Sequence, residues 1–401
     1  MTAPLLLDLS HTSHSQARTG IQRVARSLYT ALRTGAVAIT HDPYAGTWRE
    51  LDGWEKATLA ATGVTAGGRG ARWPIHTKIR GRLQHWFGNK PAICLPSSAL
   101  NGGLLVPEVF SPAAAAALPA LLAATRGPRV ALFHDAIALK FPELTPLKTV
   151  ARFPGYLQEL LVFDGIAAVS EDSRQSLLEY WRWLGVNVAE APPVQAIPLG
   201  VELTEFHLIS EILRDARPPI VLSVGSIEGR KNHIALLDAA EQLWAAGKQF
   251  ELRLIGLAHP LTGRPALERV HALQAARRPL RYDGPVDDAT LDAAYAACAF
   301  TVYPSLSEGF GLPVLESLAR GKPCICSARG ALGESARGGG CLTLAIMDIP
   351  SLAAGIDLLL SSKTEYARHT AEARARTFKS WIAYARELAG WLQTLPRRGK
   401  V

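Results

Sequence analysis

Short apolar runs alternate along the chain with longer segments whose apolar residues recur at helical spacing, which is the pattern of parallel βαβ units. The runs are rich in branched residues, as buried strands are. The strands predicted in this way are Leu5–Leu9, Val37–Thr40, Val130–Phe133, Ile166–Val169, Ile220–Val224, Phe250–Ile255, Phe300–Tyr303 and Cys324–Ser327. The pattern therefore predicts an α/β protein with parallel sheets.

One helix is expected after the first strand of each half of the chain. The first has an apolar stripe over Ile21–Leu32 and stops at Gly35, a residue type that suits the turn after a helix. The second carries apolar positions over Ile234–Trp244 and ends before Gly247. Each half of the chain thus begins with a βαβ unit.

The length of the chain predicts two domains. A chain of 401 residues is longer than a domain with a single hydrophobic core usually is. Its composition, 48% hydrophobic and 19% charged residues, is typical of a packed protein. The boundary is predicted near Pro198–His207, after the last strand of the first half and before the polar stretch that runs through Arg217–Pro219. We expect an N-terminal domain over residues 1–198, a C-terminal domain over 199–377, and a cleft between them.

No segment predicts export or a membrane span. The first residues lack a basic leader, and the longest apolar stretch, Ala113–Ala124, is too short to cross a bilayer. The five cysteines are scattered and form no Cys-x-x-Cys pair, so a reducing cytoplasm is expected. The net charge of +8 favours partners that carry phosphate. Nucleic acid is not expected to be among them, because no motif supports it.

The clearest candidate site is the run Glu308–Glu316, which follows the predicted strand Phe300–Tyr303. Gly309 and Gly311 permit close approach of the backbone, and the free N–H groups at the start of the next helix can bind phosphate or a sugar hydroxyl. Glu316 lies about one turn into that helix, where its carboxylate can accept two hydrogen bonds from a ribose diol. Alternatively, both glutamates are solvated acids favoured by the helix dipole.

The spacing Glu-x7-Glu with an internal Gly-Phe-Gly resembles the signature of retaining glycosyltransferase family 4. That resemblance implies the GT-B fold, in which two Rossmann-like, doubly wound domains face a central cleft. It also implies that Glu308 contacts the donor sugar and Glu316 the ribose. The other donor-site residues of this run are Gly309, Phe310, Gly311 and Leu312.

A second run, Ser223–His233, resembles the donor-phosphate loop of the same family. Gly225 follows a strand, and Arg230 and Lys231 precede a helix, so two cations can compensate a diphosphate leaving group. Some members carry an arginine where this chain has Ser226, so Arg230 is expected to take more of that role. The alternative is an exposed basic pair. No Asp-x-Asp occurs, so no metal site is expected.

In the N-terminal half, Asp8–Val24 resembles the first strand, glycine loop and helix of a subgroup common in bacterial surface-polysaccharide assembly. Gly20 is expected to approach the diphosphate across the cleft. His134 follows a strand at the sheet edge where ligands of α/β proteins bind, and is expected to face the donor sugar. A core histidine bonded to backbone is the alternative, and that interpretation is favoured for His11 and His14.

Three further segments carry weaker predictions. Ser170–Arg174 is expected to cap a helix, with an acceptor contact as the alternative. Phe378–Trp381 resembles the closing helix of the family, so residues 378–401 are expected to cross back to the N-terminal domain. Residues 69–90 contain no acid and either rest on an anionic membrane or form an ordinary solvated insertion. Their cations and aromatics are Arg69, Arg72, Lys78, Arg80, Arg82, Lys90, Trp73, Trp86 and Phe87.

The resemblance covers nearly the whole chain and implies a retaining, metal-independent hexosyltransferase without a cofactor. Arg230 and Lys231 are expected to stabilise the departing diphosphate, while His134 and Glu308 orient the sugar. The expected donor is a GDP- or UDP-sugar, with GDP-mannose as the subgroup-based choice. The expected acceptor is a growing or lipid-linked glycan, as in lipopolysaccharide assembly at the inner face of the plasma membrane. Alternatives are a nucleotide-sugar epimerase of the same architecture and a sugar-binding protein without catalysis.

Overall fold

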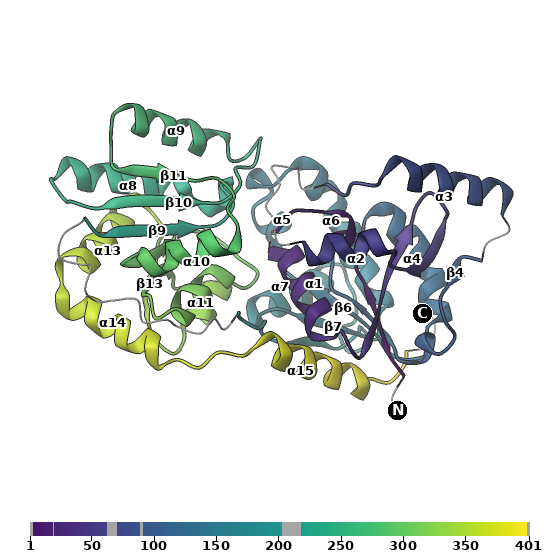
Figure 1. Cartoon of the computed structure of the whole chain (residues 1–401). Helices are drawn as coiled ribbons and strands as arrows, with labels where there is room; N and C mark the ends of the chain where they lie inside the picture. Colours follow the sequence, from purple (N-terminus) through teal and green to yellow (C-terminus); the bar gives the residue numbers. More distant parts are fainter. Residues whose placement is uncertain (1–2, 19, 62–69, 89–90, 203–217, 399–401) are drawn as a thin grey trace.

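The computed structural model describes residues 3–18, 20–61, 70–88, 91–202 and 218–398. The chain forms two lobes side by side, each built on one sheet (Figure 1). Successive residues of the central strands enter different cores: Leu6 of the first strand packs in one cluster, and Leu5 and Leu7 pack in another. Each sheet is therefore covered by helices on both faces, which is the predicted α/β architecture.

The sheet of the N-terminal lobe has the order β4-β3-β2-β1-β5-β6-β7-β8. Its strands are β1 (Leu5–Asp8), β2 (Ala36–Asp42), β3 (Thr47–Glu50), β4 (Ile93–Cys94), β5 (Leu104–Val106), β6 (Arg129–Phe133), β7 (Gly165–Ala168) and β8 (Val194–Ala196). All neighbours are parallel except β2 and β3. The helices are α1 (Gly20–Ala31), α2 (Gly53–Ala60), α3 (Ile75–Phe87), α4 (Pro112–Ala124), α5 (Ile137–Lys140), α6 (Leu147–Glu159) and α7 (Glu171–Trp183), with a 3-10 turn, η1 (Thr12–His14), after β1.

The sheet of the C-terminal lobe is entirely parallel, with the order β11-β10-β9-β12-β13-β14. Its strands are β9 (Ile220–Val224), β10 (Glu251–Ile255), β11 (Leu280–Tyr282), β12 (Phe300–Tyr303), β13 (Cys324–Ser327) and β14 (Cys341–Leu344). The helices are α8 (His233–Ala245), α9 (Arg264–Ala275), α10 (Asp288–Ala297), α11 (Leu312–Ala319), α12 (Gly330–Ala336), α13 (Ile349–Ser361) and α14 (Lys363–Ala375), with a 3-10 turn, η6 (Gly229–Lys231), before α8. In sequence order this is the 3-2-1-4-5-6 arrangement of the Rossmann fold.

The final helix, α15 (Trp381–Thr394), runs from the C-terminal lobe onto the N-terminal lobe (Figure 1). Its Tyr384, Leu388 and Leu392 are buried in the same core cluster as Leu7 and Val24 of the N-terminal lobe. A main-chain hydrogen bond of 2.8 Å from Val201 N to the Lys379 carbonyl ties the two inter-lobe crossings together. The chain therefore passes between the lobes twice.

All eight predicted strands are present, within two residues at each end. The six strands that were not predicted, β3, β4, β5, β8, β11 and β14, span two to four residues each, too few for a distinct apolar run. The predicted helices match α1 and α8, but Ile234 is 43% exposed rather than part of the buried stripe of α8. Ile234 lies in the first turn of α8. Leu237 and Trp244, further along the helix, are the predicted positions that are buried.

Of the predicted domain boundary, residues 203–207 lie outside the described part of the chain, as do Arg69 and Lys90 of the basic stretch. Each sheet falls within one of the two predicted domains. Within the described residues, no helix combines the length and the apolar character that crossing a membrane requires.

Candidate active site

Both candidate donor motifs lie at the carboxyl ends of neighbouring strands. β9 leads into Gly225 and then into η6, and β12 leads into the loop Glu308–Gly311. The two strands pair side by side, but their crossover connections run to opposite ends of the sheet. Such a topological switch point is where parallel α/β sheets bind ligands. The fold thus brings together two motifs that are about eighty residues apart in the sequence.

A cavity of about 640 Å³ lies at this edge and is lined by residues of both lobes. The predicted residues that line it are Gly20, His134, Gly225, Ser226, Arg230, Lys231, Glu308, Gly309, Phe310, Gly311 and Leu312. Glu316 is not among the lining residues, but it forms an ion pair with Arg23, which is. The structure therefore brings the predicted site residues together at one cleft.

Glu308 is bound by both cations of the β9 loop. Its Oε2 lies 2.9 Å from Nη1 of Arg230, and its Oε1 lies 2.5 Å from Nζ of Lys231. The hydroxyls of Tyr303 and Ser305 donate to Oε1 at 3.0 and 2.5 Å. The side chains of Arg230, Lys231 and Glu308 are only 21%, 9% and 10% exposed. The alternative interpretations, an exposed basic pair and a solvated acid, are therefore wrong for these residues.

The cations also determine the ionisation of Glu308. Burial acts to raise the pKa of this carboxyl group, but Arg230 and Lys231 outweigh it and lower the pKa to about 2. Burial and the charge of Arg230 lower the pKa of Lys231, against the attraction of Glu308. The pKa of Tyr303 is raised by burial and by Glu308, so its hydroxyl stays protonated as a donor. Glu308 is an anion at neutral pH and is held by cations.

Ser226 directly follows Gly225 in the loop after β9. Its Oγ donates a 3.0 Å hydrogen bond to Oε1 of Glu228, and the same oxygen lies 3.0 Å from Nη2 of Arg230. Arg230 therefore forms ion pairs with two carboxylates, those of Glu228 and Glu308. These contacts fix its guanidinium at the cavity wall.

Glu316 contacts the opposite lobe. Its Oε1 pairs with Arg23 of α1, and Tyr295 of α10 donates to Oε2 at 3.4 Å. Its side chain is 3% exposed, so the interpretation as a solvated acid is wrong here as well. Glu316 raises the pKa of Arg23. A second ion pair between the lobes, of 2.6 Å, joins Arg18 to Asp288.

Arg18 and Arg23 were not predicted to be site residues, although both flank Gly20 within Asp8–Val24. Their position beside a glycine at a helix start was the available signal. Their partners could not be inferred, because Arg23 and Glu316 are separated by 293 residues. Gly20 itself is the first residue of α1, with open space where a Cβ would lie.

Gly309 is a point of close approach between the lobes. A Cβ on this residue would lie 2.1 Å from the carbonyl oxygen of His134, so no side chain fits. Ser170 Oγ donates a 2.6 Å hydrogen bond to the Gly309 carbonyl, and Ser173 Oγ donates a 2.8 Å bond to the His134 carbonyl. Ser170 also caps α7, as expected. Its hydroxyl therefore joins the two lobes as well as capping the helix.

Gly311 is the residue before α11 and has a φ of +101°, a conformation that other residues rarely adopt. It allows the chain to turn sharply from the Glu308–Gly309 loop into the helix. Leu312, the first residue of α11, packs in the core cluster of the N-terminal lobe. Phe310 packs against clusters of both lobes.

His134 is 8% exposed and lines the cavity. Its Nε2 lies 2.7 Å from the Pro107 carbonyl, and burial lowers the pKa of the ring. A neutral ring that donates from Nε2 satisfies both observations. His134 thus makes the backbone hydrogen bond expected of a core histidine and also lies in the cavity wall.

His14 is a core histidine, as favoured from the sequence. It is 2% exposed, its Nε2 lies 2.7 Å from Glu55, and its ring stacks on Trp73 at 3.9 Å. Burial lowers the pKa of His11. No group of three or more His, Cys, Asp or Glu side chains in the described part of the chain is placed to hold a metal ion.

Two lobes that are each built on a largely parallel sheet and line one cleft have the architecture of the GT-B class of glycosyltransferases. Residues 207–376 match the model of the family Glycosyl transferases group 1. The structure of Anabaena Alr3699/HepE, solved with UDP and glucose, superposes with a TM-score of 0.68 at 16% identity and covers 98% of this chain and 100% of that one. At that identity the likeness shows the fold alone.

Two curated relatives narrow the class. The serotype-specific mannosyltransferase WbdA of Escherichia coli is 26% identical over 356 residues, which are 81% of this chain and 38% of that protein. The O-antigen chain mannosyltransferase B of Escherichia coli is 30% identical over 222 residues, 51% of this chain and 54% of that protein. The chain thus spans about two fifths to one half of the length of these relatives. The chain thus has the GT-B fold and is similar to glycosyltransferases of the surface-polysaccharide type.

The contact at Gly309 gives a direct test of the lobe arrangement. Gly309→Ala is expected to push the β12–α11 loop away from His134 and to lower the free energy of unfolding by about 1–3 kcal/mol. Gly390→Ala on the exposed side of α15, where a Cβ meets nothing within 4 Å, is the matched control and should stabilise the chain by about 0.5–1 kcal/mol. Urea unfolding measures both. Equal behaviour of the two variants would contradict the close contact.

Proposed function

We propose that this chain is a retaining, metal-independent hexosyltransferase that moves a sugar from a nucleoside diphosphate to a hydroxyl of a growing or lipid-linked glycan. The observation that carries the proposal is the buried cation pair Arg230–Lys231 beside the glycine loop Glu308–Gly311. A cavity lined by two cations and by a glycine loop that leads into a helix suits a diphosphate. Mannose from GDP-mannose is the proposed donor, since the relatives named above are mannosyltransferases.

The proposed chemistry is electrostatic. As the bond between the sugar and the diphosphate breaks, negative charge grows on the leaving phosphate, and Arg230 and Lys231 stabilise it. Glu308 is an unsuitable nucleophile, because its two oxygens already bind cations and its pKa lies near 2. The acceptor hydroxyl then attacks from the face that the diphosphate leaves, and the departing phosphate oxygen takes its proton. The sugar keeps its anomeric configuration.

Four residues are proposed to hold the rest of the donor. Glu308 and His134 line the cavity and would orient the sugar hydroxyls. Glu316 would accept from the ribose diol while it keeps its ion pair with Arg23. Gly20 would let the backbone of the N-terminal lobe approach the diphosphate from the other side of the cavity.

The epimerase alternative gains no support from the relatives. It remains distinguishable by stoichiometry, because an epimerase converts the donor without any acceptor, whereas a transferase releases one nucleoside diphosphate for each glycan extended.

Replacing the buried lysine tests the role of the cations. Lys231→Ala is expected to lower kcat by roughly 100- to 1000-fold, the usual effect of removing one stabilising group from a developing anion. Lys379→Ala, whose partner Glu387 is on the surface, is the matched control and should leave kcat unchanged. Transfer of isotope-labelled sugar from GDP-mannose to a mannose-terminated glycan measures both, with circular dichroism as the check on folding. Near wild-type transfer by Lys231→Ala would contradict the proposed role of Lys231 in stabilising the leaving diphosphate.

Metal removal and product stereochemistry test the remaining features. Enzyme treated with EDTA is expected to keep full transfer activity, since the cations are supplied by side chains. Proton NMR of the product from an α-linked donor should show an α-linkage. Loss of activity that Mg²⁺ or Mn²⁺ restores would contradict metal independence, and a β-linked product would contradict retention.

A further inference from the structure

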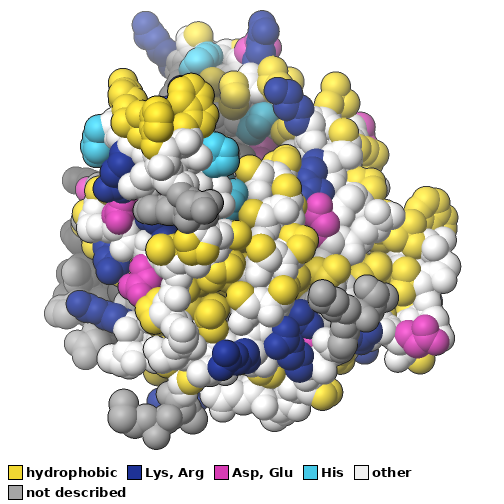
Figure 2. Space-filling model, turned by 90° about the vertical axis from the view of Figure 1, so that its right-hand side faces the viewer, with side chains coloured by type: hydrophobic (Ala, Val, Ile, Leu, Met, Phe, Trp, Pro, Cys, Tyr) yellow, Lys and Arg dark blue, Asp and Glu magenta, His cyan; other side chains and the backbone are white. Residues whose placement is uncertain are grey.

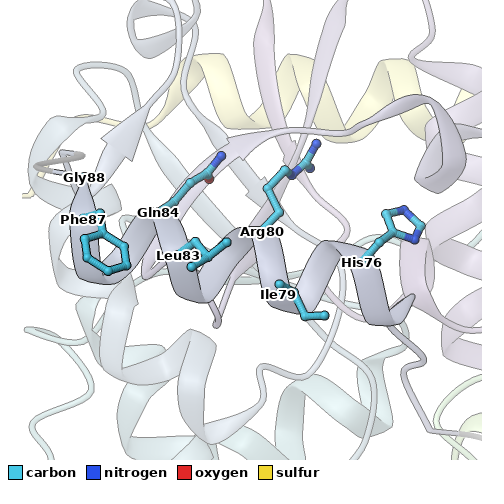
Figure 3. A pocket seen from close by; sticks show the side chains of 7 residues that line it. All are labelled: His76, Ile79, Arg80, Leu83, Gln84, Phe87 and Gly88. Carbon is cyan, nitrogen blue, oxygen red and sulfur yellow. The ribbon is translucent and has the colours of Figure 1, made fainter.

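The helix α3 presents its large apolar side chains to solvent and its small residues to the protein. Ile75, Ile79, Leu83, Trp86 and Phe87 are 75%, 54%, 50%, 77% and 82% exposed. Figure 3 shows Ile79, Leu83 and Phe87 following one another along the helix, with Arg80 and Gln84 pointing away from them. A helix that only covered its own lobe would bury this stripe.

The inner side of α3 explains why the stripe faces outward. Thr77 and Gly81 are the buried residues of the helix, and a Cβ on Gly81 would lie 2.7 Å from Cβ of Tyr44. Small residues are therefore required against the lobe, and the contact leaves no room for the larger side chains. The outward stripe is a built feature of the helix and not a result of loose packing.

The charge of α3 points to the partner of this surface. The helix carries Lys78, Arg80 and Arg82 and no acid. Lys78 and Arg82 each lie 5.8 Å from the ring of Tyr44, and Arg80 pairs with Asp52 at 2.7 Å. Figure 2 views this end of the molecule and shows hydrophobic side chains gathered near the top with Lys and Arg side chains around them. Apolar and aromatic residues flanked by cations match an anionic lipid surface.

The root of α3 joins this surface to the cavity. Trp73, just before the helix, stacks on His14, and Arg72 N donates a 2.7 Å hydrogen bond to the His14 carbonyl. The segment that follows His14 contributes Gln16, Ala17 and Arg18 to the cavity wall. The start of α3 therefore packs against the segment that leads into the cavity wall. A membrane that bound α3 would lie against the N-terminal lobe.

We propose that α3 is an interfacial helix that docks this protein on an anionic bilayer, with Ile79, Leu83, Trp86 and Phe87 entering the headgroup region and Lys78, Arg80 and Arg82 binding anionic headgroups. A lipid-borne substrate would then reach the cleft from the side of α3. The docking itself does not depend on the proposed sugar transfer, because it involves neither donor nor acceptor.

Vesicle flotation of the full chain tests this proposal. The protein is expected to bind vesicles of equal parts phosphatidylcholine and phosphatidylglycerol at least about tenfold more tightly than phosphatidylcholine alone. Ile79→Ser/Leu83→Ser/Phe87→Ser should weaken that binding at least about tenfold, since it removes most of the apolar stripe. Lys78→Gln/Arg82→Gln should weaken it at least about fivefold and reduce its dependence on salt.

The matched control is Trp183→Ser/Leu261→Ser/Ile382→Ser, which removes three exposed apolar side chains elsewhere and should bind as wild type. Thermal unfolding of each variant shows that it is folded, since all the substituted side chains are on the surface. Failure of the wild type to bind anionic vesicles, or equal binding by the Ile79 triple variant, would overturn the proposal. So would sedimentation that shows a dimer of the wild type and a monomer of that variant, because α3 would then be a contact between two copies.

Discussion

The buried ion pairing of Glu308 with Arg230 and Lys231 is the interaction on which the cleft depends. Two cations and one carboxylate are held with little exposure to water, and buried charges are tolerated only when they are paired and hydrogen bonded. Tyr303 and Ser305 complete the pairing from β12 and its loop. The cluster thus fixes the β9 and β12 loops to each other and holds both cations at the cavity wall.

The second constraint is that the site is assembled from both lobes. Gly309 touches the backbone of His134, Ser170 bonds to the same loop, and Glu316 binds Arg23. Together with α15, which ends in the core of the N-terminal lobe, these contacts hold the glycine loop against the opposite lobe. In the proposed reaction, a donor bound to the C-terminal lobe meets residues of the N-terminal lobe in the same cavity.

The sequence predicted the features that depend on local pattern. Branched apolar runs located eight of the strands, and glycines after strands located the two loops at the switch point. The features it could not predict depend on contacts between distant residues. Nothing local pairs Arg23 with Glu316, and the short β3 turns back antiparallel on β2 without an apolar run of its own. The sequence offered a membrane-facing interpretation for Trp86 and Phe87 in residues 69–90, but not the outward stripe of a whole helix. The periodicity of a helix does not say which face is buried; that depends on the fit of Gly81 against Tyr44.

The central claim is that Arg230 and Lys231 neutralise the diphosphate of the donor. Calorimetric titration of the protein with GDP and with GMP, and likewise with UDP and with UMP, gives the two affinities whose ratio measures the contribution of the second phosphate. The account predicts that the diphosphate of the donor base binds at least about tenfold more tightly than its monophosphate, and that Arg230→Gln/Lys231→Gln brings the ratio close to one. Equal affinities in the wild type, or an unchanged ratio in the double variant, would contradict it.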